Sequence, residues 1–189
     1  MSIPTTVQAA PFAIPSYQPS DIQSAFKSIK TQWPTSPLRV ALWNTSHGIW
    51  KPFLEITPEE VQESVNLNII AAFAFAREVI TAFKELDVEK GKRGTLIFTG
   101  ATASLRGNVT TSAFAAGKHG LRALSQSLAK EFGKQNIHVS VCWGGTLGIH
   151  LADLLFFHPS GCSCKPLTLL WHVLSCLLTF AHTGNHWRK

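Results

Sequence analysis

Apolar residues in this chain alternate between short continuous runs and longer stretches in which they recur every three or four positions. The short runs predict buried parallel strands at residues 38–42, 95–99 and 137–141. The longer stretches predict helices at residues 20–32, 58–85 and 112–132, each with one apolar face. Since strands that alternate with long helices form parallel sheets, we expect an α/β fold with a partial doubly wound parallel sheet.

Capping signals set the helix boundaries in this prediction. Ser20-Asp-Ile-Gln23 has the spacing of a capping box, and Thr57-Pro-Glu-Glu60 combines a cap, a first-turn proline and a glutamate three residues on. The first helix should end near Trp33-Pro34, because the residue before a proline avoids helical geometry. The apolar face expected for the second helix consists of Val61, Val65, Ile69, Ala72, Ala76, Ile80 and Phe83.

Composition narrows the class of protein. The 189 residues are 45% hydrophobic, which suffices for one buried core. The net charge of +6 is scattered along the chain without a long basic run, so we expect no nucleic-acid partner. The first residues lack the pattern of a signal peptide, which favours a cytoplasmic location. The apolar run at residues 167–181 is too short for a membrane span.

The two ends of the chain differ from its middle. Residues 1–18 are proline-rich and aperiodic, which predicts a mobile leader before a core at residues 19–141. All four cysteines lie after residue 141, and Asp153 is the only acidic residue after Glu131. We therefore expect residues 142–189 to be an atypical tail, from a retained intron or a shifted reading frame, with an ordinary buried segment as the alternative. Cys162 and Cys164 lack zinc-ligand spacing, so no metal site is expected.

Residues 94–141 read as a strand, a small-residue loop, a long helix and a second strand. In this order and spacing the chain resembles the catalytic half of the short-chain dehydrogenase/reductase family, and the resemblance extends from Asp21 to Val141. It implies a Rossmann-like sheet. It also implies hydride transfer between NADP or NAD and a carbonyl or alcohol of a small molecule.

The resemblance assigns roles to individual positions. The family's Tyr-x-x-x-Lys stands here as Phe114-Ala-Ala-Gly-Lys118, so Lys118 would bind the ribose hydroxyls of the cofactor. The family's serine falls on Ala101, thirteen residues before Phe114. Thr102 is a candidate to donate a hydrogen bond in its place, and the alternative is that Thr102 is a turn residue.

Two asparagines complete the site that the resemblance implies. Asn68 maps onto the helix asparagine that holds a water in the family's proton relay, with Asn66 as the rival if the register shifts. Asn44 is the one residue kept from the family's Asn-Asn-Ala-Gly turn, which packs on the adenine side of the cofactor. Both are therefore expected near the cofactor.

The departures from the family pattern predict impaired activity. A phenyl ring at Phe114 has no proton to give, and the methyl group of Ala101 cannot polarise a carbonyl. The first glycine is Gly48, so no glycine-rich phosphate loop precedes it, and the chain is expected to begin inside the family's third strand or the following helix. The alternative function is a non-catalytic fragment or pseudoenzyme, a scaffold that forms homo- or hetero-oligomers through helices 58–85 and 112–132.

Overall fold

A computed structural model of the chain describes residues 9–143, and three strands form one sheet in the order β1-β2-β3 with both pairings parallel. The strands are β1 (Val40–Trp43), β2 (Gly94–Gly100) and β3 (Ile137–Trp143). The α-helices are α1 (Pro19–Gln32), α2 (Pro58–Val65), α3 (Ala72–Lys84) and α4 (Ser112–Phe132). Shorter turns are η1 (Phe53–Glu55), η2 (Asn66–Ala71), η3 (Thr102–Ser104) and η4 (Gly133–Gln135). The expected partial doubly wound α/β fold is confirmed.

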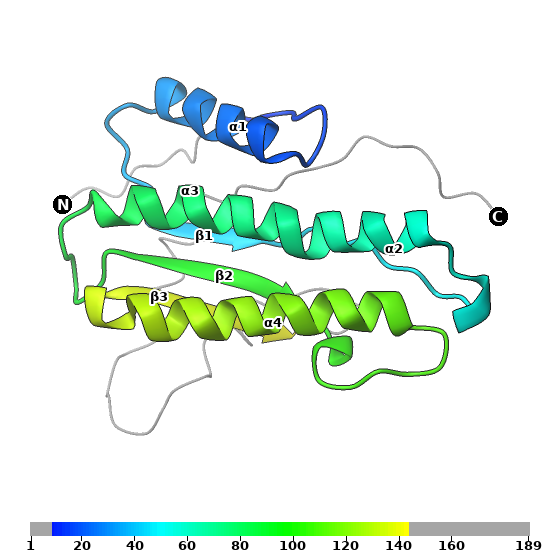
Figure 1. Ribbon diagram of the computed structural model, residues 1–189. Helices are drawn as coiled ribbons and strands as arrows, with labels where there is room; N and C mark the ends of the chain where they lie inside the picture. The colour runs from blue at the N-terminus through cyan, green and yellow to red at the C-terminus, as the bar shows by residue number, and fades with distance from the viewer. Residues whose placement is uncertain (1–8, 144–189) are drawn as a thin grey trace.

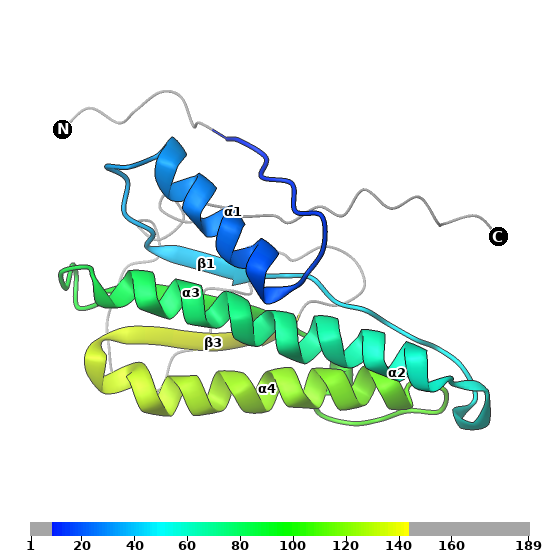
Figure 2. The ribbon, with the colours of Figure 1, turned by 45° about the horizontal axis from the view of Figure 1, so that its top comes forward.

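The helices lie over one face of the sheet (Figures 1 and 2). α4 packs on β2 and β3, α3 packs on β1 and β2, and α1 contacts α3. Crossovers between parallel strands are right-handed, and both crossovers here step in the same direction across the sheet. The two connecting helical segments are therefore placed on the same side, where α4 contacts α2 and η2 of the other segment.

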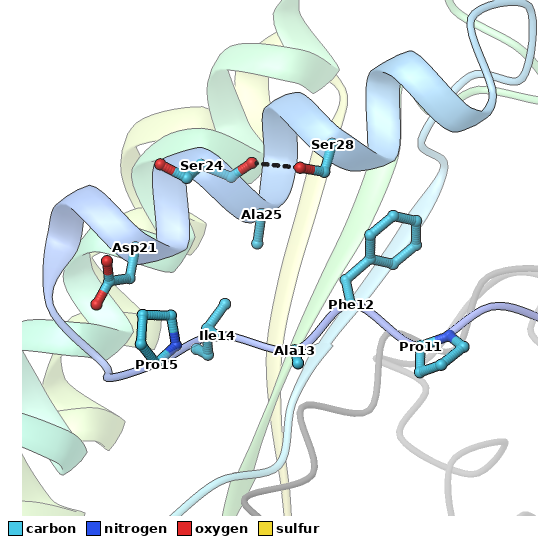
Figure 3. Close-up of a pocket in the computed structure, with 9 residues that line it drawn as sticks. All are labelled: Pro11, Phe12, Ala13, Ile14, Pro15, Asp21, Ser24, Ala25 and Ser28. Atoms are coloured by element: carbon cyan, nitrogen blue, oxygen red, sulfur yellow. Dashed lines mark hydrogen bonds between the residues drawn. The ribbon is translucent and has the colours of Figure 1, made fainter.

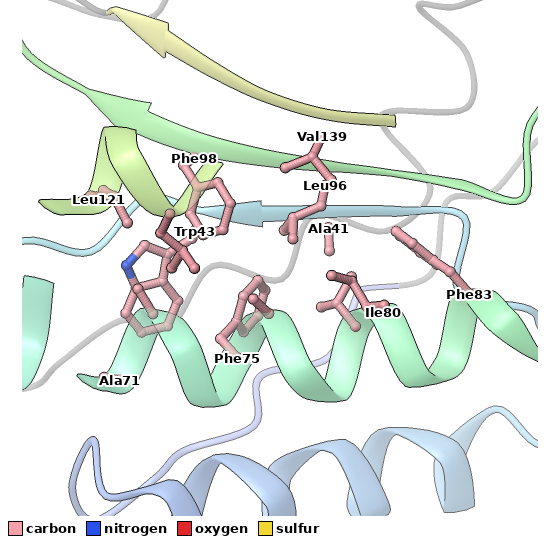
Figure 4. Packing of buried hydrophobic residues seen from close by; sticks show 14 of the residues in the cluster. Ala41, Trp43, Ala71, Phe75, Ile80, Phe83, Leu96, Phe98, Leu121 and Val139 are labelled. Atoms are coloured by element: carbon pink, nitrogen blue, oxygen red, sulfur yellow. The ribbon is translucent and has the colours of Figure 1, made fainter. Parts of the chain in front are cut away.

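The hydrophobic core fills the space between these helices and the sheet (Figure 4). The strand residues that face it alternate along the chain, as the pleat requires: Ala41 and Trp43, Leu96 and Phe98, and Ile137 and Val139. The indole of Trp43 is 1% exposed, and its ring centroid lies 5.0 Å from that of Phe75 in α3. Aromatic packing therefore joins the first strand to the central helix.

Helix α2 begins as the sequence predicts, but α1 does not. Thr57 and Glu60 form the expected capping box, with Glu60 N donating to Thr57 Oγ1 over 3.3 Å and Thr57 N donating to the Glu60 carboxylate over 3.0 Å. The capping box predicted at Ser20 is wrong, because Gln18 is the N-cap and Pro19 occupies the first turn. Proline suits that position since its missing N–H would have no helical partner.

The predicted uninterrupted helix at 58–85 contains the π-helical turn η2. One extra residue in the turn rotates the helix face, as π-bulges do. Val61, which was expected in the apolar stripe, is 42% exposed, whereas Ser64 and Asn68 are buried. Spacing counted from an ideal period of about 3.6 residues cannot predict such a shift, so the expected apolar stripe is wrong at Val61. Val65 and Ile69 are half-buried, and the expected residues in α3 are buried.

The strand boundaries shift by a few residues from those predicted. β1 starts at Val40 and ends at Trp43, whereas the strand was predicted at residues 38–42. Leu38 therefore precedes the strand, and Trp43, which lay outside the predicted range, belongs to it. The register pairs Leu42 with Ile97 and Trp43 with Phe98, which confirms that the first two strands are adjacent and parallel. β3 continues through Trp143, and predictions for later residues lie outside the described part of the chain.

Residues 9–18, in the expected leader, contact the folded chain. Phe12 meets Trp33 edge-to-face at 5.5 Å between ring centroids, and Tyr17 meets Trp43 in the same way at 6.2 Å. Between this segment and α1 lies a groove of about 290 Å³ (Figure 3). Apolar residues and Ser24, Ser28 and Asp21 line it. Residues 1–8 lie outside the described range.

Among residues 9–143, the continuous helix Pro58–Lys84 is long and apolar enough to cross a membrane by length and composition alone. Its apolar side chains in α3 include Phe75, Val79 and Phe83, which belong to the core against the sheet. The core helix of an α/β domain passes the same test, and the α3 part of this helix packs against the sheet.

Gly94 provides a test of this packing. A Cβ atom at Gly94 would lie 2.4–2.6 Å from the ring atoms of Phe83, a side chain that is fully buried. We expect Gly94→Ala to lower the free energy of unfolding by about 1–3 kcal/mol. Gly133→Ala is the matched control, because no atom lies within 4 Å of its Cβ position. Urea unfolding followed by circular dichroism measures both, and equal stabilities for the two variants would contradict the packing described.

Candidate functional site

The candidate site lies at the carboxyl edge of the sheet. Parallel strands bring their carboxyl ends to the same edge, where ligands of α/β folds bind. Asn44 follows β1, Thr99 lies near the end of β2, and Cys142 pairs with Thr99 from β3. Thr99 Oγ1 donates a hydrogen bond of 2.7 Å to Asn44 Oδ1, so the ends of β1 and β2 are tied together. Asn44 is exposed at this edge.

Lys118 reaches the same edge from α4. Its side chain is 3% exposed, and its Nζ atom donates a hydrogen bond of 2.8 Å to the backbone carbonyl of Thr99. No carboxylate among the described residues forms an ion pair with it. Burial lowers the pKa of Lys118 from 10.5 to about 8, since the charged form is poorly solvated there, while the nearby Cys142 acts in the opposite direction.

The thiol of Cys142 was not singled out from the sequence. It is a free cysteine among the described residues, at the end of β3. Burial raises the pKa of the Cys142 thiol, and its contact with Thr99 and the charge of Lys118 oppose that rise. Cys142 therefore lies close enough to Lys118 for the two groups to influence each other's pKa. Its side chain is a neutral thiol at neutral pH.

Phe114 lies one helical turn before Lys118. The centroid of its ring is 5.9 Å from Lys118 Nζ, within the range of a cation–π contact. The ring of Phe114 also contacts that of Trp50, at 5.2 Å between centroids with the planes tilted by 41°. No sequence pattern indicated Trp50, which comes from the loop after β1 and meets α4 only in the folded chain.

In the loop after β2, the hydroxyl group of Ser104 forms a hydrogen bond that closes the turn. Ala101 N donates a hydrogen bond of 3.1 Å to Ser104 Oγ, and Ser104 N donates one of 2.8 Å to the carbonyl of Ala101. Ser104 is fully buried, whereas Thr102 is exposed at the start of η3, where its carbonyl accepts from Leu105 N. The position of Thr102 at the start of η3 fits the turn-residue alternative, and the hydrogen bond of Lys118 goes to Thr99.

Asn68 is fully buried, and its side chain makes four hydrogen bonds inside the protein. Its Oδ1 accepts from Ser46 Oγ at 3.1 Å and from His47 N at 3.3 Å. Its Nδ2 donates to the His47 carbonyl at 2.9 Å and to Ser64 Oγ at 3.1 Å. An amide side chain offers two donors and two acceptor sites, and all four are used. The side chain of Asn68 therefore fixes the turn after β1 and has no free capacity for a relay water.

Two further contacts lock Asn68 against α4. Ser64 Oγ donates a hydrogen bond of 3.3 Å to the carbonyl of Ala113. A Cβ atom at Gly117 would lie 2.9 Å from both Cβ and Nδ2 of Asn68. A glycine inside a helix costs about 1 kcal/mol relative to alanine, so its presence next to Lys118 is explained by this close approach.

The structure thus brings Asn44 and Lys118 together through Thr99, and Phe114 and Lys118 through their own contact. Asn68 is linked to the same region because it donates to Ser64, which in turn donates to the carbonyl of Ala113, next to Phe114. Over residues 9–143 no group of three or more His, Cys, Asp or Glu side chains could hold a metal ion. The arrangement can bind hydroxyl groups through a fixed ammonium, but Phe114 and Ala101 offer no side-chain proton for transfer.

Comparison with known proteins gives the family. The profile of the family described as short chain dehydrogenase matches residues 4–153. L-rhamnose-1-dehydrogenase of Scheffersomyces stipitis is 34% identical over 104 residues, which are 55% of this chain and 39% of that enzyme. The chain therefore spans well under two thirds of the length of this relative.

Solved structures agree with the profile. A short-chain dehydrogenase from Rhodopseudomonas palustris superimposes with a TM-score of 0.60 and 31% identity, over 67% of this chain and 56% of that one. A short-chain dehydrogenase from Escherichia coli CFT073, described as putative and solved with NADPH, gives a TM-score of 0.57 and 25% identity over 66% and 49% of the two chains. With the parallel sheet and the order of its elements, these matches show that the chain belongs to the short-chain dehydrogenase family.

Proposed function

We propose that this chain carries a short-chain dehydrogenase/reductase site for hydride transfer between a nicotinamide cofactor and a carbonyl or alcohol of a small molecule, impaired at the proton-transfer step. The observation that carries the proposal is the buried ammonium of Lys118 beside the ring of Phe114, at the carboxyl edge of the sheet. The lysine expected to bind the ribose of the cofactor lies there, and a phenyl ring stands in the place of the expected acid.

Lys118 fits the role of holding a cofactor, NADP or NAD. An ammonium group has three donors, and the carbonyl of Thr99 takes one of them. Two donors remain for the vicinal hydroxyls of a ribose, and the low polarity of the site strengthens such bonds. Asn44 lies at the same edge through its bond to Thr99, in position to contact the cofactor. The nicotinamide ring, when bound, would supply or accept the hydride.

The residues of this chain supply little of the accompanying proton transfer. A positioned acid contributes about 10²–10⁴-fold to such a step, and neither Phe114 nor Ala101 has a proton to transfer. Burial raises the pKa of the Cys142 thiol, and Thr102 is exposed at the start of η3. We therefore infer binding of the cofactor with turnover close to background.

Cofactor binding should depend on Lys118 and on its charge. Lys118→Met is expected to weaken NADPH binding about tenfold or more at pH 7, because hydrogen bonds from a charged donor are lost. Since burial lowers the pKa of Lys118 to about 8, the group is charged below that pH and neutral above it. Binding should accordingly fall as the pH rises through 8. Quenching of tryptophan fluorescence by NADPH measures both effects.

The exposed Lys130 on the same helix gives the matched control for Lys118. Lys130→Met should bind NADPH like the unmodified chain and should keep the same fall above pH 8. Equal loss of binding in both variants would show that general charge, and not the buried ammonium, attracts the cofactor. Unchanged binding in Lys118→Met would remove the lysine from the cofactor site.

Restoring the two missing groups should restore activity. We expect Phe114→Tyr combined with Ala101→Ser to raise NADPH-dependent carbonyl reduction by about 10²–10⁴-fold over the unmodified chain, because a phenol beside Lys118 provides a proton donor. Phe114→Tyr with Ala103→Ser is the matched control, since Ala103 lies two residues further along the loop. Oxidation of NADPH followed by absorbance measures turnover. If the unmodified chain reduces carbonyls as fast as the double variant, the assignment of the proton-transfer positions is wrong.

A second candidate function is a dimerising scaffold that pairs two copies of the chain. Val61, Ile70 and Phe73 are 42%, 43% and 57% exposed along the continuous helix, which places large apolar side chains outside the core. Burying such side chains in a partner recovers about 25 cal/mol for each Å² of apolar surface. The exposed side chains of Val61, Ile70 and Phe73 favour self-association whether or not the chain is catalytically active.

Light scattering on the purified chain tests the scaffold. We expect a dimer that Phe73→Asp dissociates, because an unpaired carboxylate in an apolar interface is costly. Phe53→Asp in the turn η1 is the control, since Phe53 is 74% exposed and lies outside the long helices. A stable monomer for the unmodified chain, or equal behaviour of the two variants, would contradict the scaffold.

A further inference from the structure

The indole of Trp50 lies against Phe114 yet remains largely open to solvent. It is 60% exposed, and its ring centroid is 5.2 Å from that of Phe114. The same phenyl ring lies 5.9 Å from Lys118 Nζ. An exposed indole, a half-buried phenyl ring and a buried ammonium therefore follow one another from the surface inwards.

The loop that carries Trp50 is held at several points. A Cβ atom at Gly48 would lie 2.2 Å from the Trp50 ring, so the absence of a side chain there lets the indole fold back over the loop. Lys51 N donates a hydrogen bond of 3.0 Å to the carbonyl of Thr110, in the loop before α4. The indole is thus anchored towards the helix that carries Phe114.

The side chain of Lys51 anchors the other end of this loop. Its Nζ atom is paired with the carboxylate of Glu60 in the first turn of α2. Lys51 and the backbone of Thr57 hold the pKa of Glu60 below its usual value, so the carboxylate is charged at neutral pH. The loop is therefore fixed both to α2 and to the segment before α4.

Single exposed apolar residues are common on protein surfaces, and Phe53 in the same region is an example. Trp50 differs because it lies against a second ring, that of Phe114, and because the absence of a side chain at Gly48 makes room for it. Aromatic side chains held open in this way contribute strongly to binding, since they offer a large rigid apolar area at little entropic cost. The position of Trp50 next to Phe114 places this area beside the expected reaction centre.

We propose that Trp50 and Phe114 form an aromatic wall that selects carbonyl compounds with a planar aromatic ring. The ring of the ligand would stack on the exposed indole, which places its carbonyl group on the side of Lys118. The inference rests on the proposed function for the direction of the carbonyl, and it adds the substrate class. An aliphatic ring of equal size has no π-face to stack on the indole, so only the burial of its apolar surface would contribute to its affinity.

Two ketones of nearly equal size test the wall: acetophenone, and cyclohexyl methyl ketone as its saturated counterpart. Their affinities for the full chain can be measured by ligand-observed NMR titration. We expect acetophenone to bind about three- to tenfold more tightly than the saturated ketone, from the added value of an aromatic pair. Equal affinities for the two ketones would overturn the proposal.

Variants of the chain test whether the preference for acetophenone depends on the indole of Trp50. Trp50→Ala should bring acetophenone down to the affinity of the saturated ketone, whereas Trp50→Phe should keep most of the preference. Phe53→Ala, which removes another exposed ring nearby, should change neither affinity. The preservation of the preference in Trp50→Phe shows that the loop is folded. An unchanged preference in Trp50→Ala would contradict the role of the indole.

The titrations are done without cofactor, so they separate this inference from the proposed function. A ketone preference without any binding of NADPH supports the aromatic wall and counts against the oxidoreductase site. Binding of NADPH through Lys118, without a preference between the ketones, supports the site and counts against the wall.

Discussion

The close approach of two helices at Asn68 and Gly117 is the constraint on which the candidate site depends. The buried amide occupies the space that a side chain at Gly117 would fill, and its four hydrogen bonds also hold the turn that contains Ser46 and His47. A buried amide left with unpaired groups would cost about 1–3 kcal/mol for each group. The same bonds therefore stabilise the helix pair and set the position of the loop after β1.

The position of Lys118 follows from this contact. One residue after the glycine, its side chain points from α4 to the end of β2, where the Thr99 carbonyl receives it. Burial without a carboxylate partner destabilises the charged form, and the lowered pKa expresses that cost. A folded chain keeps such a group only where neighbours compensate, and here a carbonyl and the face of Phe114 provide the compensation.

Under the proposed function, a phenyl ring at Phe114 in the place of a phenol would change the chemistry of the site more than its shape. Phe114 keeps the ring in contact with Lys118, and Trp50 covers part of it. The turn that contains Ala101 is closed by the hydrogen bond from Ala101 N to Ser104 Oγ. Under the proposed function, the binding site would persist without its acid, because the residues that position the ring and the ammonium are separate from those that would transfer protons.

The sequence by itself determined the α/β order, the three strands and the long helices, because short apolar runs, a helical period of about 3.6 residues and the cap at Thr57 are local properties of the chain. It also indicated Phe114 and Lys118, which lie one turn apart on one helix. The tertiary structure alone decided the π-helical turn at Asn68, the saturation of that amide, the contact of Trp50 with Phe114 and the neighbourhood of Cys142. These depend on which residues distant in the chain meet, and local spacing carries no record of such contacts.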